Sequence, residues 1–390
     1  MNLEKTKEHK DEIYTCNRTR CGFCIQRCPV YEVLKMETYS SRGRTLVARG
    51  LMEGTLEENE EIIKLANTCL LCGYCEKNCA LDNTEIFRAF KADLVEAGMT
   101  DRFIETGVKS LEKYGNPYKK KPEVREFPEI KSNDKSKTLL YGGCTYSIMY
   151  PEILKLMAEL LEDVKYLGAE EPCCLNMLWD SGHVEDFEEK KKAVVKKLNG
   201  ANVEELVTGC PTCFRTFVDE YAEELEAKPV HFITKLQKLI KDNKMEFASP
   251  EPIKVTWHDP CHLGRFGGMI DEPREIIKSV ENVELVEMEN SGLDSHCCGG
   301  GSAMLMSYPE IAIEVAKNRY REAEEAGAEM ILTFCPICEH TLQKGAQIIT
   351  REETDFYEDY DFDNPPPPPE PKIKVLNLLE WLLPLKKETN

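Results

Sequence analysis

The sequence predicts an α/β protein in which a small helical domain precedes two copies of a Rossmann-like α/β unit. Three observations support this fold class. Apolar residues recur at helical spacing in the first 115 residues, where strand signals are almost absent. From residue 137 onward, short apolar runs alternate with amphipathic helical patterns, as in a parallel sheet covered by helices. This second part also repeats itself, since "EELVTGCPTC" and "EMILTFCPIC" recur 125 residues apart.

The repeat and the composition divide the chain into four segments. Residues 1–115 are expected to form the helical domain, and the Lys- and Pro-rich stretch 116–136 a linker. The first α/β unit is expected over 137–246 and the second over 247–390, with an acidic, Pro-rich insertion at 351–371. The C-terminal run "VLNLLEWLLPL" could be a membrane-surface helix, but its match to "HFITKLQKLI" in the first copy favours a helix that closes the second unit.

The 390 residues include 18 cysteines and carry a net charge of −20. Such an acidic chain has no surplus of basic residues to neutralise phosphates, which argues against a nucleic-acid partner. The N-terminal stretch does not resemble a signal peptide, and no apolar run is long enough to cross a bilayer. We therefore expect a cytoplasmic protein, associated with a membrane, if at all, through a redox partner. In a reducing cytosol this many cysteines indicate metal binding or redox chemistry rather than disulfides.

Eight of the cysteines lie in two runs in the helical domain. The second run, "CLLCGYCEKNC", has the spacing Cys-x2-Cys-x2-Cys-x3-Cys, by which a loop binds three corners of a cubane [4Fe–4S] cluster. The fourth cysteine of such a run usually binds the other cluster, so we expect a helical, ferredoxin-like domain with two cubanes. The predicted ligand sets are Cys16, Cys21, Cys24 and Cys79 for the first cubane, and Cys69, Cys72, Cys75 and Cys28 for the second.

The first run departs from the usual pattern, and a second kind of metal site is an alternative. Four residues instead of two separate Cys16 from Cys21, and Ala80 follows Cys79 where proline is common. Sets of four cysteines also bind structural zinc. Zinc sites usually use two well separated Cys-x2-Cys pairs, however, so four cysteines within eleven residues favour the cubanes.

The other ten cysteines form two sets of five, one in each α/β unit. Each set contains a cysteine after the first strand, an adjacent pair and a Cys-Pro-x-Cys motif. The strand pattern places four of them, Cys144, Cys210, Cys261 and Cys335, just beyond the carboxyl ends of apolar strands, where ligand sites form in open α/β sheets. A thioredoxin-like pair or a zinc site would leave cysteines over in both copies, so a larger iron–sulfur assembly fits better. The predicted sets are Cys144, Cys173, Cys174, Cys210 and Cys213, and Cys261, Cys297, Cys298, Cys335 and Cys338.

This order of cysteines resembles that of the CCG-domain iron–sulfur proteins, and "VTWHDPCHLGRFGG…SHCCGGG…FCPIC" is close to their C-terminal motif. With its two-cubane domain, the whole chain is similar to heterodisulfide reductases of the D-subunit type. The resemblance implies that each five-cysteine set holds a noncubane [4Fe–4S] cluster. It also implies that the pair cleaves the disulfide of coenzyme M and coenzyme B by one-electron steps. Leu175 stands where the family motif has glycine, so the first set could hold an altered cluster or another metal.

Three histidines lie near the cysteines of the second set: His258, His262 and His296. One of them could protonate a departing thiolate, since imidazole titrates near neutral pH. The alternative is a structural role, in which a histidine hydrogen-bonds a cluster sulfide or a backbone carbonyl and tunes the reduction potential. The segment "SSRGR", with Arg42 and Arg44, resembles an Arg-Gly segment of the same family that supports cubane packing and charge.

We therefore expect the catalytic iron–sulfur subunit of a heterodisulfide reductase-like complex, which reduces a disulfide to two thiols. Both five-cysteine sets are complete, which favours disulfide chemistry within the family. The chain has no G-x-G-x-x-G fingerprint for a flavin or nicotinamide, so its electrons must come from a redox partner subunit. A membrane cytochrome b, a soluble flavoprotein or a ferredoxin-type donor would serve. The alternative is an electron-transfer component of a flavin-dependent lactate, glycolate or glycerol-3-phosphate dehydrogenase, or of a sulfite-reduction membrane complex.

Overall fold

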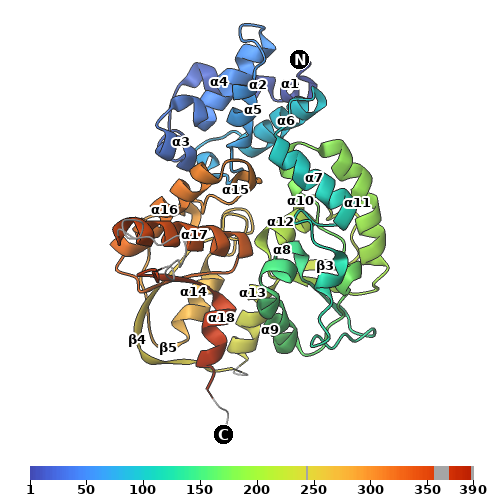
Figure 1. Cartoon of the computed structure of the whole chain (residues 1–390), viewed down its shortest axis with the longest axis vertical. Coiled ribbons are helices and arrows are strands. Elements are labelled where there is room, and N and C mark those ends of the chain that lie inside the picture. Colours follow the sequence, from blue (N-terminus) through green and yellow to red (C-terminus); the bar gives the residue numbers. More distant parts are fainter. Residues whose placement is uncertain (243–244, 355–368, 388–390) are drawn as a thin grey trace, which may run out of the picture.

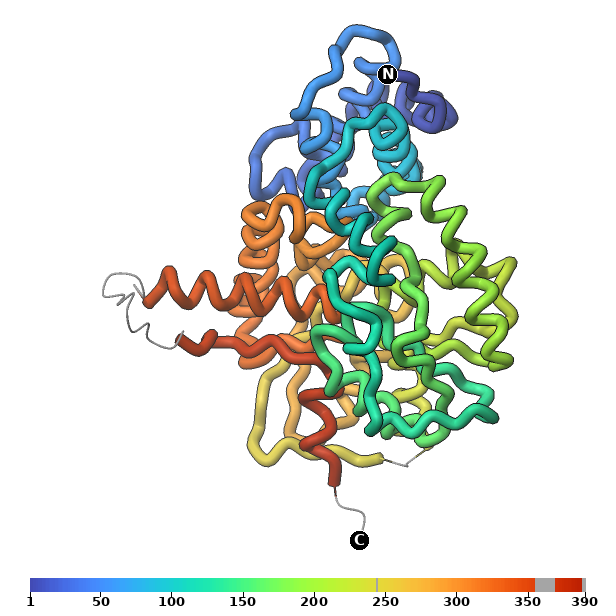
Figure 2. Tube along the Cα trace, turned by 45° about the vertical axis from the view of Figure 1, so that its right-hand side comes forward, coloured from blue at the N-terminus to red at the C-terminus, as the bar shows by residue number. Residues whose placement is uncertain are grey.

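The computed structural model describes residues 1–242, 245–354 and 369–387 of the chain. A helical domain at one end sits on two α/β units that lie side by side (Figure 1, Figure 2). Both sheets are parallel throughout, as expected when helices connect successive strands. The predicted fold class, a helical domain followed by two Rossmann-like α/β units, is confirmed.

The helical domain consists of short helices with two cysteine-bearing loops between them. Its core is formed by apolar side chains such as Ile13, Ile62, Phe87 and Phe90, which are all nearly inaccessible. Several of the helices begin at residues whose side chains accept backbone hydrogen bonds, among them Asp82 and Asp101. The helices are α1 (Glu4–Glu8), α2 (Lys10–Thr19), α3 (Pro29–Leu34), α4 (Ser41–Met52), α5 (Glu60–Asn67), α6 (Asn83–Glu96) and α7 (Arg102–Tyr114).

The first α/β unit has a three-stranded sheet in the order β1-β2-β3. In its register Leu140 lies beside Val207, and Val207 beside Val230, so the strands share one apolar layer. The strands are β1 (Thr138–Tyr141), β2 (Glu205–Thr208) and β3 (Lys228–His231). The helices are α8 (Gly143–Met149), α9 (Pro151–Leu161), α10 (Asn176–Ser181), α11 (Val184–Asn199), α12 (Pro211–Asp219) and α13 (Phe232–Lys241).

The second α/β unit has the same plan with one more strand, in the order β5-β4-β6-β7. Val255 of the central strand lies beside Leu285 on one side and Met330 on the other. The strands are β4 (Ala248–Trp257), β5 (Glu281–Leu285), β6 (Met330–Thr333) and β7 (Lys374–Asn377). The helices are α14 (Asp271–Lys278), α15 (Met304–Ser307), α16 (Pro309–Glu325), α17 (Pro336–Glu353) and α18 (Leu378–Leu382).

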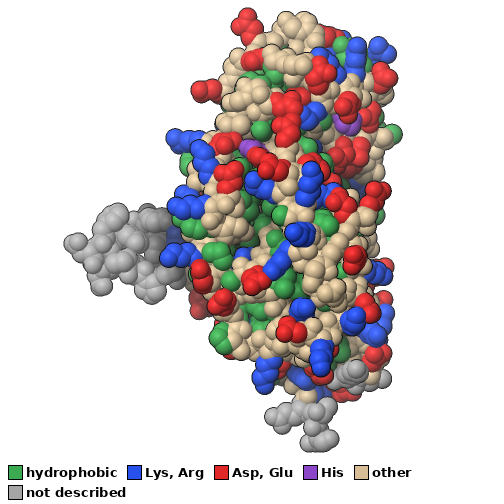
Figure 3. Space-filling view, turned by 90° about the vertical axis from the view of Figure 1, so that its right-hand side faces the viewer, with side chains coloured by type: hydrophobic (Ala, Val, Ile, Leu, Met, Phe, Trp, Pro, Cys, Tyr) green, Lys and Arg blue, Asp and Glu red, His purple; other side chains and the backbone are tan. Residues whose placement is uncertain are grey.

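The three parts are joined by shared apolar cores. Phe334 of the second unit packs in the same buried cluster as Tyr146 of the first. Leu70 of the helical domain belongs to a second cluster with Val315 on α16. The side of the molecule that bears α11 carries acidic and basic side chains mixed together (Figure 3). The site regions therefore lie inside a single packed body.

The predicted domain boundaries stay a prediction. The stretch 116–136 lies against the first unit, because Ile130 enters its core and Arg125 donates to the Ala169 carbonyl at 3.2 Å. Of the predicted insertion at 351–371, residues 355–368 lie outside the described part of the chain.

The C-terminal helix closes the second unit. Leu378, Leu379 and Leu382 of α18 are fully buried, so their side chains contact protein rather than a membrane surface. This placement agrees with the interpretation that the end of the second copy repeats the end of the first. No helix in the described ranges is long and apolar enough to cross a bilayer.

Substitution of Gly182 tests the contact between the helical domain and the first unit. Gly182 has φ +88°, and an added Cβ would lie 2.5 Å from the Lys91 backbone of α6. We expect Gly182→Ala to lower the melting temperature clearly more than Gly98→Ala. Gly98 has φ +73° with open space around it, so alanine there costs only the left-handed conformation, about 1 kcal/mol. Equal melting temperatures for the two variants would contradict this close packing.

Candidate metal centres

The cysteines of the second predicted cubane set meet around one cavity. Cys28 stands immediately before α3, while Cys69, Cys72 and Cys75 lie on the loop between α5 and α6. All four line the same cavity, together with Arg44. Burial raises the pKa of Cys28, and it raises the pKa of Cys75 well above its usual range. Burial makes these thiols hard to ionise, and a bound metal cation would stabilise their thiolates.

The first predicted cubane set draws on both cysteine runs. Cys16, on the last turn but one of α2, accepts a hydrogen bond from Thr45 Oγ1 at 3.3 Å. Burial raises the pKa of Cys16, and the neighbouring Cys79 and Cys21 raise it further. Burial also raises the pKa of Cys24 to about 11. The structure thus brings Cys79 from the second run to the cysteines of the first, as the crossed ligand assignment requires.

Both groups fit the predicted cubanes, because each offers four cysteine sulfurs and basic side chains lie beside them. Arg44 is only 1% exposed, and its Nη1 atom lies 4.0 Å from Cys28 Sγ. The same guanidinium donates to the Leu65 carbonyl at 3.0 Å and to Thr68 Oγ1 at 3.2 Å. Arg42 is less buried and donates to the backbone of the first cysteine loop. Arg44 therefore places a fixed positive charge where four thiolates would gather negative charge.

The five cysteines of the first α/β unit converge at the carboxyl edge of its sheet. Four of them are buried and Cys144 is half-buried. Their sulfurs form one connected group through the neighbouring pairs Cys144 and Cys173, Cys173 and Cys174, Cys174 and Cys213, and Cys213 and Cys210. Five sulfurs are one more than a tetrahedral zinc ion binds, whereas a larger iron–sulfur cluster accommodates them.

The five cysteines of the second unit repeat this arrangement. Their sulfurs are connected through Cys261 and Cys297, Cys297 and Cys298, Cys298 and Cys338, and Cys338 and Cys335. In this group a ring nitrogen of His258 also lies within 4.8 Å of both Cys298 Sγ and Cys338 Sγ. Cys298 has a pKa well below its usual range because Cys297, Cys338 and His258 stabilise its thiolate.

The backbone after each cysteine pair adopts the same conformation in both units, although the residues differ. Gly299 has φ +89°, and its amide faces Cys297 Sγ at 3.5 Å. Leu175 has φ +65°, and its amide faces Cys173 Sγ at 3.4 Å. A leucine in this left-handed region costs about 1–2 kcal/mol relative to glycine. Loss of the family glycine at residue 175 therefore leaves the ligand loop of the first unit intact.

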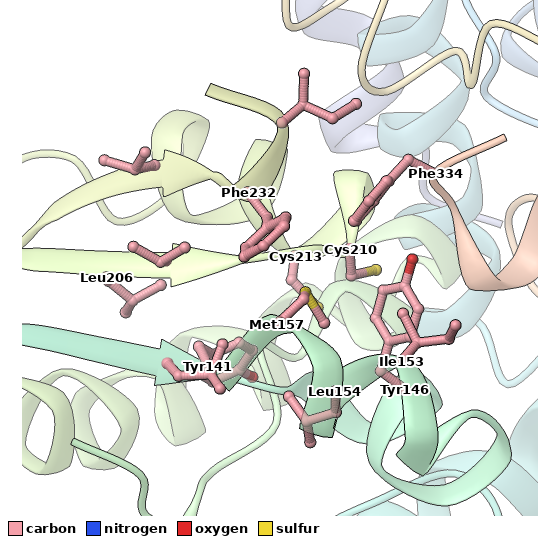
Figure 4. Close-up of a cluster of buried hydrophobic side chains, with 14 of the residues drawn as sticks. Tyr141, Tyr146, Ile153, Leu154, Met157, Leu206, Cys210, Cys213, Phe232 and Phe334 are labelled. Carbon is pink, nitrogen blue, oxygen red and sulfur yellow. The ribbon is translucent and has the colours of Figure 1, made fainter. Parts of the chain in front are cut away.

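The two five-cysteine sets face each other across the boundary between the units. Cys210 lies near enough to Cys335 to raise its pKa, after the larger effect of burial. Gly209 allows this approach, because an added Cβ there would lie 2.9 Å from the Phe334 ring. Figure 4 shows Phe334 of the second unit pointing toward Cys210 and Tyr146 of the first. The carboxyl edges of both sheets therefore open toward one shared region.

The helical domain contacts the second five-cysteine set directly. Cys72 and Cys297 are neighbours, and the contact with Cys297 lowers the pKa of Cys72 to about 6. Arg265 holds the junction together, since it donates to the Cys72 carbonyl at 2.7 Å and to the Ser295 carbonyl at 2.6 Å. Its guanidinium also lies over the Tyr74 ring, 4.9 Å from the centroid. One arginine thus fastens the cysteine loop of the helical domain to the loop that carries Cys297.

The three predicted histidines occupy different positions around the second set. His258 Nδ1 accepts a hydrogen bond from Arg319 Nε at 3.1 Å, and its pKa is lowered by burial. Burial lowers the pKa of His262 to about 3. His296 Nδ1 is hydrogen-bonded to Glu322, and its ring packs against a tyrosine of the helical domain. A proton-donor role for any of the three stays a prediction.

Sequence reasoning missed two residues that organise these sites. Glu171 is 2% exposed and accepts hydrogen bonds from the amides of Gly142 and Gly143, the turn before Cys144. Arg319 orients His258, as described above. The sequence does offer one indication of the role of Glu171, because this residue stands directly before the Pro-Cys-Cys segment. Arg319 gives no such signal, because it lies in a strongly charged stretch of α16.

Removal of Arg44 should destabilise the helical domain. We expect Arg44→Leu to leave several buried acceptors unpaired and to lower the free energy of unfolding by at least about 3 kcal/mol. Arg49→Leu on the same helix should have little effect, because Arg49 makes a surface ion pair with Glu53 at 2.8 Å. Denaturant-induced unfolding of the two variants, followed by the circular dichroism of the helices, gives the free energies of unfolding that test this. Similar losses in both would contradict the structural role of Arg44.

Family models match most of the regions described above. Residues 138–218 and 255–343 match the cysteine-rich CCG domain, and residues 12–83 match the 4Fe-4S dicluster domain. The two CCG matches contain both five-cysteine sets, and the dicluster match contains all eight cysteines of the helical domain.

Curated relatives include reductase components from methanogens and a bacterial oxidoreductase. The chain is 29% identical over 367 residues to the D subunit of the dihydromethanophenazine:CoB–CoM heterodisulfide reductase of Methanosarcina mazei, covering 86% of this chain and 89% of the relative. It is 25% identical over 359 residues to the B subunit of the fumarate reductase (CoM/CoB) of Methanothermobacter marburgensis, covering 86% and 69%. It is 26% identical over 317 residues to a probable iron–sulfur-binding oxidoreductase of Bacillus subtilis, covering 75% and 45%.

Proposed function

We propose, from the premise that this chain belongs to the CCG-domain iron–sulfur proteins, that it is the catalytic component of a heterodisulfide reductase-like complex. Its relatives are iron–sulfur oxidoreductases, and the heterodisulfide reductase chains among them match over nearly their whole length. The proposed reaction adds two electrons and two protons to a disulfide, breaks its S–S bond and releases two thiols. The disulfide of coenzyme M and coenzyme B, or a related one, is the proposed substrate.

The observation that carries this proposal is the pair of complete five-cysteine sets that face each other. A disulfide has two sulfur atoms, and cleavage separates them, so two adjacent metal sites suit its two products. Cys210 and Cys335 belong to opposite sets, and Cys210 lies near enough to affect the pKa of Cys335 across the boundary. Noncubane [4Fe–4S] clusters, which both sets would hold, supply one-electron reduction of the substrate sulfurs when bound.

The four cysteine groups lie in a series that suits electron entry from a partner. Cys21 of the first cubane set is exposed. Cys28 neighbours Cys24 and also belongs to the second cubane set, which connects the two groups. Cys72 of that second group contacts Cys297, at the edge of the second five-cysteine set. A chain of groups from the surface to the facing sets supports the proposed direction of electron delivery.

The surface around Cys21 suits a protein partner with an acidic face. Phe23 beside it is 62% exposed, and Leu46 on α4 is 57% exposed. Apart from the buried Arg44, the segment 16–50 contains six basic and only two acidic residues, in a chain with a net charge of −20. A membrane cytochrome b, a flavoprotein or a ferredoxin-type donor is the proposed redox partner, and opposite charge would speed its encounter with this surface.

A second candidate function is electron transfer without disulfide chemistry. It would place the chain in a flavin-dependent lactate, glycolate or glycerol-3-phosphate dehydrogenase, or in a sulfite-reduction membrane complex. Similarity to a probable oxidoreductase of Bacillus subtilis and to the EtfAB:quinone oxidoreductase of Syntrophomonas wolfei, which is 26% identical over 247 residues, favours it. These relatives extend well beyond the aligned region, since the alignments cover 45% and 34% of their lengths.

Anaerobic metal analysis combined with a turnover assay tests the proposal. We expect about sixteen irons per chain, four for each of four clusters, and reduction of CoM-S-S-CoB by a reduced viologen dye. A Cys297→Ser/Cys298→Ser variant should lose about four irons and all turnover, and so should the matched Cys173→Ser/Cys174→Ser variant of the first unit.

Full iron content without disulfide turnover would favour the electron-transfer function. About eight irons per chain would mean that only the cubanes form. High zinc with little iron would contradict both functions.

A further inference from the structure

We propose that His258, held in one tautomer by Arg319, donates a hydrogen bond from Nε2 to the Cys298 sulfur. By this bond the second five-cysteine set binds its cluster at a higher reduction potential than the first set does. The inference rests on the proposed function only in requiring that iron–sulfur clusters occupy both sets. In this arrangement His258 tunes one cluster, and Arg319 positions His258.

The tautomer of His258 follows from its contact with Arg319. Arg319 Nε donates to His258 Nδ1 at 3.1 Å, and a guanidinium group can only donate. Nδ1 must therefore be the unprotonated nitrogen of a neutral ring, and the ring proton sits on Nε2. Arg319 itself is 1% exposed and is fixed by bonds to the Asn290 carbonyl at 2.7 Å, to Ser295 Oγ at 3.1 Å and to Glu322 at 2.5 Å.

The protonated nitrogen has one sulfur to meet. A ring nitrogen of His258 lies within 4.8 Å of the sulfurs of Cys298 and Cys338. Nδ1 is occupied by Arg319, and Nε2 is buried with no hydrogen-bond partner in the described part of the chain. Of the two sulfurs, Cys298 is the one whose pKa the imidazole helps to lower, so it is the acceptor that we assign to Nε2. The imidazole therefore presents a single N–H group to the cysteine sulfurs.

The first unit lacks this device at the matching positions. Tyr141 precedes Cys144 by three residues, as His258 precedes Cys261. The Tyr141 hydroxyl donates to the Pro172 carbonyl at 2.8 Å and so is not available to a cysteine sulfur. The stretch of α11 that corresponds to Arg319 carries Val194 and Val195 instead of a basic residue. The second ligand set thus has an imidazole N–H donor that the first set lacks at the matching positions.

A hydrogen bond to a ligating sulfur stabilises the reduced form of a cluster more than the oxidised form, because the reduced form carries more negative charge. The donor therefore raises the reduction potential. The second set is also the one that contacts the helical domain through Cys72 and Cys297. The set that would receive electrons first is accordingly the set with the greater affinity for them.

Redox titration of matched variants, followed by EPR spectroscopy, tests this inference. We expect His258→Leu to shift the midpoint potential of one cluster downward and to leave the other three unchanged. His258→Gln should largely restore the potential, because its amide can present an N–H group in a similar place. Tyr141→Phe, the matched change in the first unit, should shift none. Arg319→Met should produce a smaller downward shift, since the ring would lose its fixed orientation.

Pulsed EPR on protein with ¹⁵N-labelled histidine provides a second readout that does not need the leucine variant to fold. We expect a ¹⁵N coupling to one reduced cluster in the parent protein and its loss in His258→Gln. Unchanged potentials in an iron-replete His258→Leu variant, or absence of the coupling, would overturn the inference. If the shift appears without disulfide turnover, the inference stands and the proposed function fails. About eight irons in the parent chain would mean that the five-cysteine sets hold no clusters, which would contradict both the inference about His258 and the proposed function.

Discussion

In a parallel sheet every strand ends at the same edge, and the candidate sites depend on this constraint. Each α/β unit has two strands followed at once by a cysteine segment, and their parallel pairing brings Cys144 close to Cys210, and Cys261 to Cys335. A reversed strand would send one member of each pair to the far side of the unit. The cysteine pairs then reach the same edge on loops. Because the α/β unit is duplicated, the protein has two such edges. The carboxyl edges of the two sheets face each other, so both five-cysteine sets open toward one region.

The two units share a plan but not their electrostatic surroundings. The left-handed backbone after the cysteine pair persists at Leu175, at a conformational cost that glycine avoids at Gly299. The turn before Cys144 is held by the Glu171 carboxylate, whereas the second unit places a histidine and an arginine near its cysteines. Retention of the strained leucine indicates that packing around the first ligand loop determines its conformation. Divergence has therefore changed the environment of the sulfurs and kept their positions.

The sequence alone predicts much of this arrangement. The spacing of the cysteines and the repeat lead to the fold class and to the four ligand sets, since parallel strands and cluster-binding loops obey general rules. It does not predict the junction of Cys72 with Cys297, which depends on how the helical domain docks on the second unit. Nor does composition show that the hydrophilic stretch 116–136 inserts Ile130 into a core. The tautomer of His258 depends on Arg319, and a charged helix pattern does not show which charges turn inward.

The contact between Cys72 and Cys297 also bears on how the protein must mature. The two cysteines come from separate parts of the fold, and each belongs to a different predicted ligand set. The arrangement of both sets at this junction therefore depends on how the helical domain docks on the second unit. Arg265 holds the docked position through its bonds to the Cys72 and Ser295 carbonyls. Completion of the two neighbouring sites is thus coupled to the assembly of the domains.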